Sequence, residues 1–155
     1  MMRTALLSAL LCVGVGCARV SSNQPVRYVV DGARAPTFRI AQGKGTALLL
    51  LNEETGARAA SMGVLELQGG GTVPEHVHAD SVEMLYVEEG GAEMTIEGQT
   101  MSVRQGDAVY IPAGLRHSAR VAESTPRFRS VQVYVGPGPE ARFRQGEPVT
   151  PAVSP

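Results

Sequence analysis

The sequence predicts an all-β protein, an antiparallel sandwich or barrel that forms one domain. From Val26 to about Val135, short runs rich in β-branched and aliphatic residues alternate with Gly, Asn and Pro, and no segment shows helical periodicity. The chain has 155 residues, the length of one domain, and 43% of them are hydrophobic, which is enough to bury a core. Trp is absent and aromatic residues make up 5%, so we expect an aliphatic core.

The expected strands are short and are separated by turn residues. They are Val26–Val30, Thr46–Leu51, Ala60–Leu67, Val82–Val87, Ala92–Ile96, Gln99–Val103, Ala108–Ile111 and Phe128–Val135. Residues 52–56 (NEETG) predict a turn, and Glu97-Gly98 predicts a two-residue hairpin turn. The last twenty residues contain five of the ten prolines. We therefore expect the barrel domain to cover residues 26–143 and residues 144–155 to form a loose tail.

The first sixteen residues have the pattern of an export signal. A short basic start, Met1-Met2-Arg3, precedes a weakly polar to apolar run from Ala5 to Gly16. Twelve such residues are too few to span a bilayer, which needs about 20. The pattern is typical of the apolar region of a secretory signal, so residues 1–16 are predicted to be a signal peptide. The alternative is a hydrophobic first strand or helix of the domain.

Cys17 ends this run after small residues and before a polar stretch. The segment Gly14-Val15-Gly16-Cys17 resembles the lipobox of bacterial lipoproteins, although Gly14 stands where that family usually has Leu. The resemblance implies a lipid on Cys17, a tether over residues 17–25, and an envelope protein anchored to a membrane and facing the periplasm. An ordinary cleaved signal, giving a secreted or periplasmic protein, is the alternative. Cleavage before Cys17 would leave the domain without a disulfide, since Cys12 is the other cysteine.

The charge balance excludes one class of partner. The net charge is −1, from 14 basic and 15 acidic residues, and the chain has no basic stripe. We therefore expect no binding of nucleic acid.

The chemistry is concentrated in three histidines and one glutamate. His76 and His78 are two residues apart, so they share a face of a strand. Glu83 can rejoin them only if residues 79–81 turn the chain, and beyond that turn it shares an inward face with apolar residues, where an unpaired carboxylate is costly. His117 follows a turn sequence at residues 111–114. Three imidazoles and one carboxylate suit one divalent transition metal ion (Fe, Mn, Ni, Cu or Zn) and leave coordination positions open.

Two motifs around these residues resemble those of the cupin superfamily. The first runs from Gly70 through His76-Val77-His78 and Glu83 to Gly90, and the second from Gly106 through Pro112-Ala113-Gly114 to His117. Fifteen residues separate them, as in small bacterial cupins. Val121 stands where the second motif usually has Asn, a position that does not bind metal. The resemblance implies a double-stranded β-helix (the cupin jelly-roll barrel), often a homodimer, with His76, His78, Glu83 and His117 as metal ligands.

Two functions follow from the resemblance, and the sequence does not decide between them. The first is a small metalloenzyme, dioxygenase-like or isomerase-like, acting on a small oxygenated molecule. The second is a non-catalytic envelope protein that binds a ligand or metal. Catalytic residues are not identified. The polar candidates near the metal are Tyr86, Tyr110, Tyr134, Arg104 and Arg116, and strand alternation places several of them outside the barrel.

Overall fold

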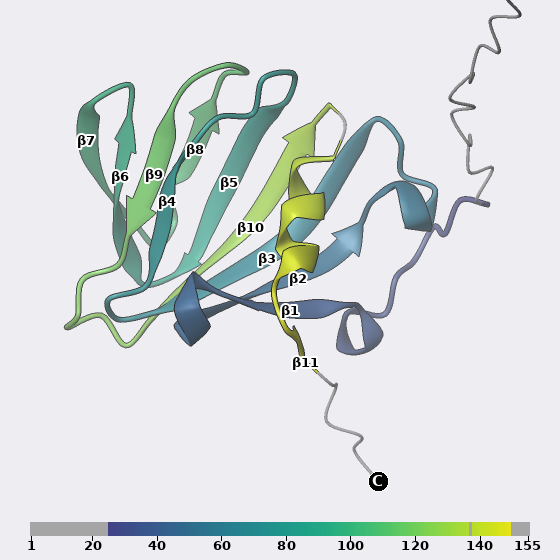
Figure 1. The fold of residues 1–155 in the computed structure, drawn as a ribbon, viewed down its shortest axis with the longest axis horizontal. Helices are drawn as coiled ribbons and strands as arrows, with labels where there is room; N and C mark the ends of the chain where they lie inside the picture. Colours follow the sequence, from purple (N-terminus) through teal and green to yellow (C-terminus); the bar gives the residue numbers. More distant parts are fainter. Residues whose placement is uncertain (1–24, 137, 150–155) are drawn as a thin grey trace, which may run out of the picture.

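Two antiparallel sheets face each other in the computed structural model, which describes residues 25–136 and 138–149. Seven strands form the larger sheet in the order β11-β1-β2-β3-β10-β5-β8, and four form the smaller in the order β4-β9-β6-β7 (Figure 1). The strands of the larger sheet are β1 (Thr37–Ile40), β2 (Gly45–Leu51), β3 (Ala60–Gln68), β5 (Val82–Glu89), β8 (Ala108–Ile111), β10 (Arg127–Val135) and β11 (Pro148–Val149). Those of the smaller are β4 (Thr72–His76), β6 (Gly91–Ile96), β7 (Gln99–Arg104) and β9 (His117–Arg120). This is the predicted jelly roll of the double-stranded β-helix.

Alternation along the strands directs one set of side chains into the space between the sheets. In β5, Glu83, Leu85 and Val87 are buried while Met84 and Tyr86 are exposed, as the sequence predicts. The apolar core is mostly aliphatic, with three Phe side chains and Met94. Its buried members are Phe38, Ala47, Leu49, Leu65, Leu67, Leu85, Val87, Ala92, Met94, Ile111, Val121, Phe128 and Phe143.

The central strand β10 changes character along its inward face. It pairs with β3 on one side and β5 on the other. From one end to the other, its buried side chains are Phe128, Ser130, Gln132 and Tyr134. Polar groups are costly to bury without partners. The end of the barrel interior near Gln132 and Tyr134 is therefore suited to polar contacts, whereas the end near Phe128 belongs to the apolar core.

Turn chemistry fixes the register at the predicted hairpin. Ile96 pairs with Gln99, and the two residues between them, Glu97 and Gly98, have φ of 45° and 79°. Positive φ at both central residues is the type I′ pattern, whose twist matches that of the strands. The turn at residues 52–56 is also present, as the 3-10 helix η3 (Glu53–Thr55), capped by the Asn52 side chain.

The structure differs from the expected strands in two respects. Val26–Val30 is not a strand, and the prediction there is wrong. Its alternating apolar residues have no strand of the described chain beside them, and Tyr28 and Val29 are almost fully exposed. Four short strands, β1, β4, β9 and β11, were not expected. Of these, β4 contains Pro74 and lies at a sheet edge, where a missing N–H breaks no ladder.

The C-terminal segment lies against the barrel as far as residue 149. The 3-10 helix η4 (Pro139–Gln145) buries Phe143 in the core, and the buried Glu140 carboxylate accepts a hydrogen bond from the Ser61 hydroxyl at 2.7 Å. After it, β11 pairs with β1. Residues 144–149 of the expected loose tail are therefore part of the fold, and residues 150–155 lie outside the described residues.

The remaining helices are single 3-10 turns, η1 (Gly32–Arg34) and η2 (Ala41–Gly43). In the part of the chain that the structure describes, no helix has the length and apolar character needed to cross a membrane. The predicted signal peptide (residues 1–16), Cys17 and most of the tether lie outside the described residues.

Candidate metal centre

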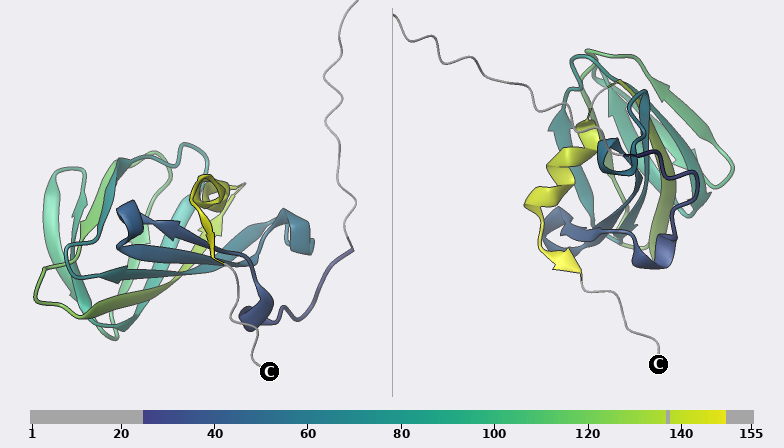
Figure 2. Two further views of the ribbon diagram at one scale, coloured as in Figure 1. Left: turned by 60° about the horizontal axis from the view of Figure 1, so that its bottom comes forward. Right: turned by 90° about the vertical axis from the view of Figure 1, so that its right-hand side faces the viewer.

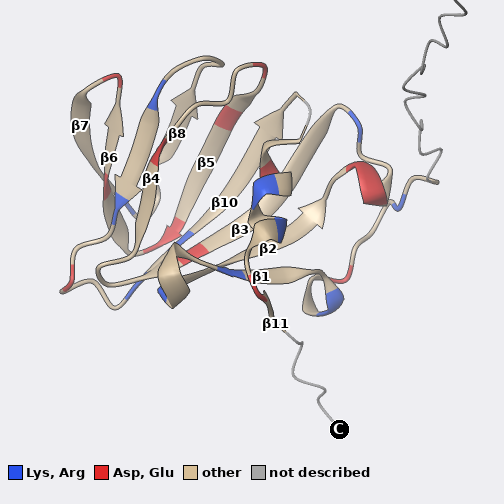
Figure 3. Ribbon diagram, in the orientation of Figure 1, with Lys and Arg blue, Asp and Glu red and all other residues tan. Residues whose placement is uncertain are grey.

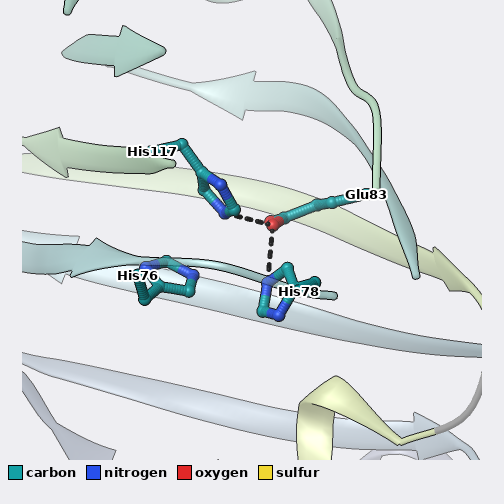
Figure 4. A group of neighbouring side chains, drawn as sticks. All are labelled: His76, His78, Glu83 and His117. Atoms are coloured by element: carbon teal, nitrogen blue, oxygen red, sulfur yellow. Dashed lines mark hydrogen bonds and ion pairs between the residues drawn. The ribbon is translucent and has the colours of Figure 1, made fainter. Parts of the chain in front are cut away.

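All four predicted ligands meet at one end of the space between the sheets (Figure 4). His76 ends β4, His117 begins β9, and the two residues are paired across those strands. His78 follows β4 in an irregular segment, and a turn at Ala79-Asp80 then returns the chain so that Glu83 points inward from β5. The predicted turn is present and explains how residues an odd number of positions apart reach one site.

The side chains converge closely. One potential ligand atom from each of the four lies within 4.8 Å of the others. The Glu83 Oε2 atom is 3.0 Å from His117 Nε2 and 3.2 Å from His78 Nε2. The His76 ring lies 4.2 Å from the His117 ring and 4.8 Å from the His78 ring, centroid to centroid.

Backbone carbonyls set the orientation of two imidazoles. His76 Nδ1 lies 2.8 Å from the Pro74 carbonyl, and His117 Nδ1 lies 2.9 Å from the Leu115 carbonyl. A carbonyl only accepts, so each Nδ1 carries the proton and donates it. Both Nε2 atoms therefore face the cluster with a lone pair available. This arrangement, in which the outer nitrogen is held by a second group, is the common support for a metal-binding histidine.

The electrostatics favour a charged Glu83 carboxylate and a neutral His76 ring. Burial alone would raise the pKa of Glu83, but hydrogen bonds with His117 and His78 lower it to about 2. Burial, and after it the charge of Arg142, lower the pKa of His76 to about 4. His117 is the exception: burial opposes its charging, yet the Glu83 carboxylate raises its pKa above the usual value.

The donor set fits a divalent metal ion. His76 Nε2 is buried and has no hydrogen-bond partner among the described residues, which is costly for a polar atom. Short contacts from two Nε2 atoms to one carboxylate oxygen need a proton or a cation between them, because lone pairs repel. A metal ion satisfies all four atoms together, and three nitrogens with one oxygen suit the first-row divalent metals.

Two hollows adjoin the cluster. A small internal cavity of about 20 Å³ lies between it and the core, with Ser130, Gln132 and Arg142 in its wall. A larger groove of about 460 Å³ opens outward, and His76 and Arg142 line it as well. The groove has β4 on one side and residues 142–146 on the other. The cluster is thus buried yet adjoins an open groove.

Of the other polar candidates, only Tyr134 reaches the site. Its ring stacks edge-on against His78 at 5.3 Å, and its hydroxyl donates to Gln132 at 2.9 Å. Burial, then the Glu83 charge, raises the pKa of Tyr134. The two other tyrosines are exposed on the outer face, and Arg104 is exposed. Arg116 forms an exposed ion pair with Glu97.

Sequence reasoning missed Arg142, which belongs to η4 in the segment rich in Pro and Gly. No periodic pattern there signals which side chain faces inward, so the sequence held no cue for it. Val121, at the departure from the second motif, packs in the core. Its N–H donates to Gly71 and its carbonyl accepts from Gly70, so the backbone makes the local hydrogen bonds.

The fold and motifs agree with comparisons against known proteins. The model of the cupin domain family matches residues 63–134. The tetracenomycin polyketide synthase protein TcmJ of Streptomyces glaucescens is 32% identical over 123 residues, 78% of this chain and 81% of that protein. Quercetin 2,3-dioxygenase of Bacillus subtilis is 31% identical over 88 residues, 57% of this chain but 26% of that protein.

A solved structure extends the likeness to the whole fold. The polyketide cyclase RemF of Streptomyces resistomycificus superimposes with a TM-score of 0.63 at 23% identity, covering 74% of this chain and 82% of that one. Such identity speaks for the fold alone, whereas the match to TcmJ spans most of both chains. The two motifs, the paired sheets and these matches show that the chain belongs to the cupin family.

Proposed function

We propose that the protein is a metal-dependent cupin enzyme, dioxygenase-like or isomerase-like, that acts on a small oxygen-rich organic molecule. The observation that carries the proposal is the convergence of three imidazoles and a carboxylate beside an open groove. Structural metal sites are closed on all sides, whereas catalytic sites keep positions open for a reactant. His76, His78, Glu83 and His117 would hold the ion, which would act as a Lewis acid and template.

The residues around the cluster have separate tasks in this proposal. Glu83 stays ionised at neutral pH and contributes the one negative charge. Pro74 and Leu115 hold two rings in place through their carbonyls. Tyr134 supports His78 by ring contact, and its raised pKa keeps it protonated, so it does not serve as a base at neutral pH.

The relatives narrow the substrate class. One is named as a polyketide synthase protein and one as a quercetin dioxygenase, so both names refer to polyoxygenated aromatic or polyketide compounds. Such molecules place two oxygens on neighbouring or alternate carbons, which lets them chelate a metal. An aromatic compound of this kind is our proposed substrate class.

The test is metal content together with oxygen uptake. Protein expressed from Ala18 onward, without a histidine-rich tag, is analysed by mass spectrometry and then supplied with phenols, diketones and hydroxy acids. About one equivalent of metal with uptake or product formation supports the enzyme. Absence of metal after reconstitution overturns the proposal.

A non-catalytic binding protein is the second candidate, and one observation favours it. Among the described residues lining the groove, His76 is the only titratable group apart from two arginines. A reaction that needs a separate general base would find none there. Metal bound at one equivalent, with tight ligand binding but no turnover across the panel, would support this candidate.

We also propose, from the sequence, that Cys17 carries a lipid and anchors the protein in the bacterial envelope. Replacing it, Cys17→Ser, should release the protein from the membrane fraction and abolish labelling by a fatty-acid probe. An unchanged distribution would favour an ordinary cleaved signal.

A further inference from the structure

Arg142 lines the groove, and no carboxylate of the described residues is close enough to its guanidinium to form an ion pair. No ion pair joins it to any described acidic residue, and its recorded contact is with the neighbouring Phe143 ring, at 4.9 Å. Other arginines nearby are paired: Arg144 with Glu54, and Arg39 with Glu147 at 3.6 Å. Arg142 is also half-buried, where an unpaired charge is costlier than at the surface.

η4 holds Arg142 in place from both sides. Before it, the Glu140 carboxylate is committed to the Ser61 hydroxyl of β3. After it, Phe143 is buried in the core and Arg144 reaches Glu54. Figures 1 and 2 show η4 on the same side of the larger sheet as the smaller sheet. Arg142 is therefore presented by an anchored segment, which lowers the ordering cost of binding a ligand.

Arg142 and the metal cluster share the same space. Arg142 and His76 both line the outer groove and both line the small inner cavity, which also contains Glu83 and His117 in its wall. The positive charge of Arg142 is felt at both His76 and His117. A molecule seated on the cluster from the groove would therefore also lie beside the guanidinium.

The charge of the groove selects for an anion. Among the described residues that line it, none is acidic and two are arginines. Figure 3 shows basic residues on η4. A divalent ion on three neutral imidazoles and one carboxylate keeps one net positive charge, to which Arg142 adds another. The rest of the wall includes Ile40, Val73 and Phe143, an apolar surface suited to a hydrocarbon or ring.

We propose that Arg142 binds a carboxylate on the substrate, so that the site takes aromatic or aliphatic acids whose carboxylate lies next to their chelating oxygen. Guanidinium is suited to this because its planar fork donates two parallel hydrogen bonds to one carboxylate. The inference rests on the proposed metal function and deepens it by naming the substrate class. Arg142 is a specificity residue here.

The test compares two ligands that differ in charge. Protein loaded with Co²⁺ is titrated with 2-hydroxybenzoate and with its neutral amide, 2-hydroxybenzamide, and binding is followed by the visible Co²⁺ spectrum. Arg142→Gln should lower the affinity for 2-hydroxybenzoate by about tenfold or more, the loss expected for a hydrogen bond between charged groups. The affinity for the amide should change by less than about twofold, because the amide has no carboxylate for Arg142 to bind.

Two further variants keep the result interpretable. Arg120→Gln, on the smaller sheet outside the groove and paired with Glu93, should leave the affinity for both ligands unchanged. Arg142→Lys keeps the charge without the fork, so its affinity for 2-hydroxybenzoate should lie between those of the wild type and Arg142→Gln. An equal preference for acid over amide in the wild type and both Arg142 variants would overturn the role of Arg142. Failure of the wild type to take up Co²⁺ would instead refute the metal centre, and the role of Arg142 with it.

Discussion

At the scale of single residues, the site is defined by which nitrogen of each imidazole is free. Two rings give their Nδ1 protons to backbone carbonyls, so the Nε2 atoms are left for the centre. In the metal-free protein, a proton on His117 Nε2 can take the place of the metal by donating to Glu83, which explains the raised pKa of His117. Metal binding and protonation are thus competing reactions of the same atom.

Replacing one ring tests the ligand set. We expect His78→Ala to weaken metal binding by more than about 100-fold, since changing even a supporting group costs 10–100-fold. The fold should remain β-rich, because His78 lies outside the strands and the apolar core. Metal content by mass spectrometry and circular dichroism are the two measurements. Glu93→Gln, at an exposed ion pair with Arg120, is the control, and equal metal in both variants would contradict the assignment.

The pH dependence of metal binding follows from the three pKa shifts. As pH falls through the raised pKa of His117, a proton competes for Nε2, so affinity should start to fall above pH 6.5. His76, with a pKa of about 4, adds a second competing proton only near that pH and should steepen the fall. Glu83, at about 2, stays ionised throughout. Competition with a chelator between pH 8 and 4.5 measures this, and a constant affinity would exclude His117 as a ligand.

At the scale of elements, glycines decide where the strands can turn. Gly90, between β5 and β6, has φ of 73°, and a Cβ there would lie 2.0 Å from the Arg127 carbonyl oxygen. Gly98, in the β6–β7 hairpin, has φ of 79° but open space around it. A side chain at Gly98 would meet only the backbone strain of positive φ, whereas one at Gly90 would meet that strain and a steric clash as well.

Substituting alanine at each should therefore give different losses. Gly98→Ala should lower the free energy of unfolding by about 1 kcal/mol, the cost of positive φ alone. Gly90→Ala should lower it by more than about 3 kcal/mol, because the β5–β6 turn must move away from β10. Urea unfolding followed by circular dichroism compares them. Similar losses of unfolding free energy in the two variants would mean that the backbone of β10 can shift at little energetic cost.

The elements also show how far the sequence could predict the structure. Seven of the eight expected strands are present because their apolar residues alternate and turn residues bound them. Val26–Val30 has the same pattern but no partner strand in the described part of the chain, and β-structure depends on pairing that a local pattern does not contain. The four clustered residues were predictable because their spacing matched a family motif. Arg142 was not, since only the tertiary path of η4 brings it to the groove.

At the scale of the whole molecule, the expected homodimer stays a prediction, and the outer face of β5 and β8 offers a surface for it. Met84, Tyr86 and Tyr110 are exposed there and line an apolar groove of about 350 Å³. Exposed apolar patches on soluble domains mark contact surfaces. Tyr110→Arg should shift the protein from dimer to monomer in light scattering. A wild-type monomer at micromolar concentration would contradict the prediction.

The metal should also stabilise the whole fold, because its ligands come from separate parts of the chain. His76 and His117 belong to the smaller sheet, and Glu83 belongs to the larger one. An ion held by all of them joins the two sheets at one end, whereas the unfolded chain presents no such site. At a free metal concentration of 100 times Kd, linkage adds about 2.7 kcal/mol. For a domain of this size, that should raise Tm by about 5–10 °C in calorimetry. His78→Ala should lose this increase while its metal-free Tm stays close to that of the metal-free wild type. An equal increase in both proteins would mean that the ion binds elsewhere.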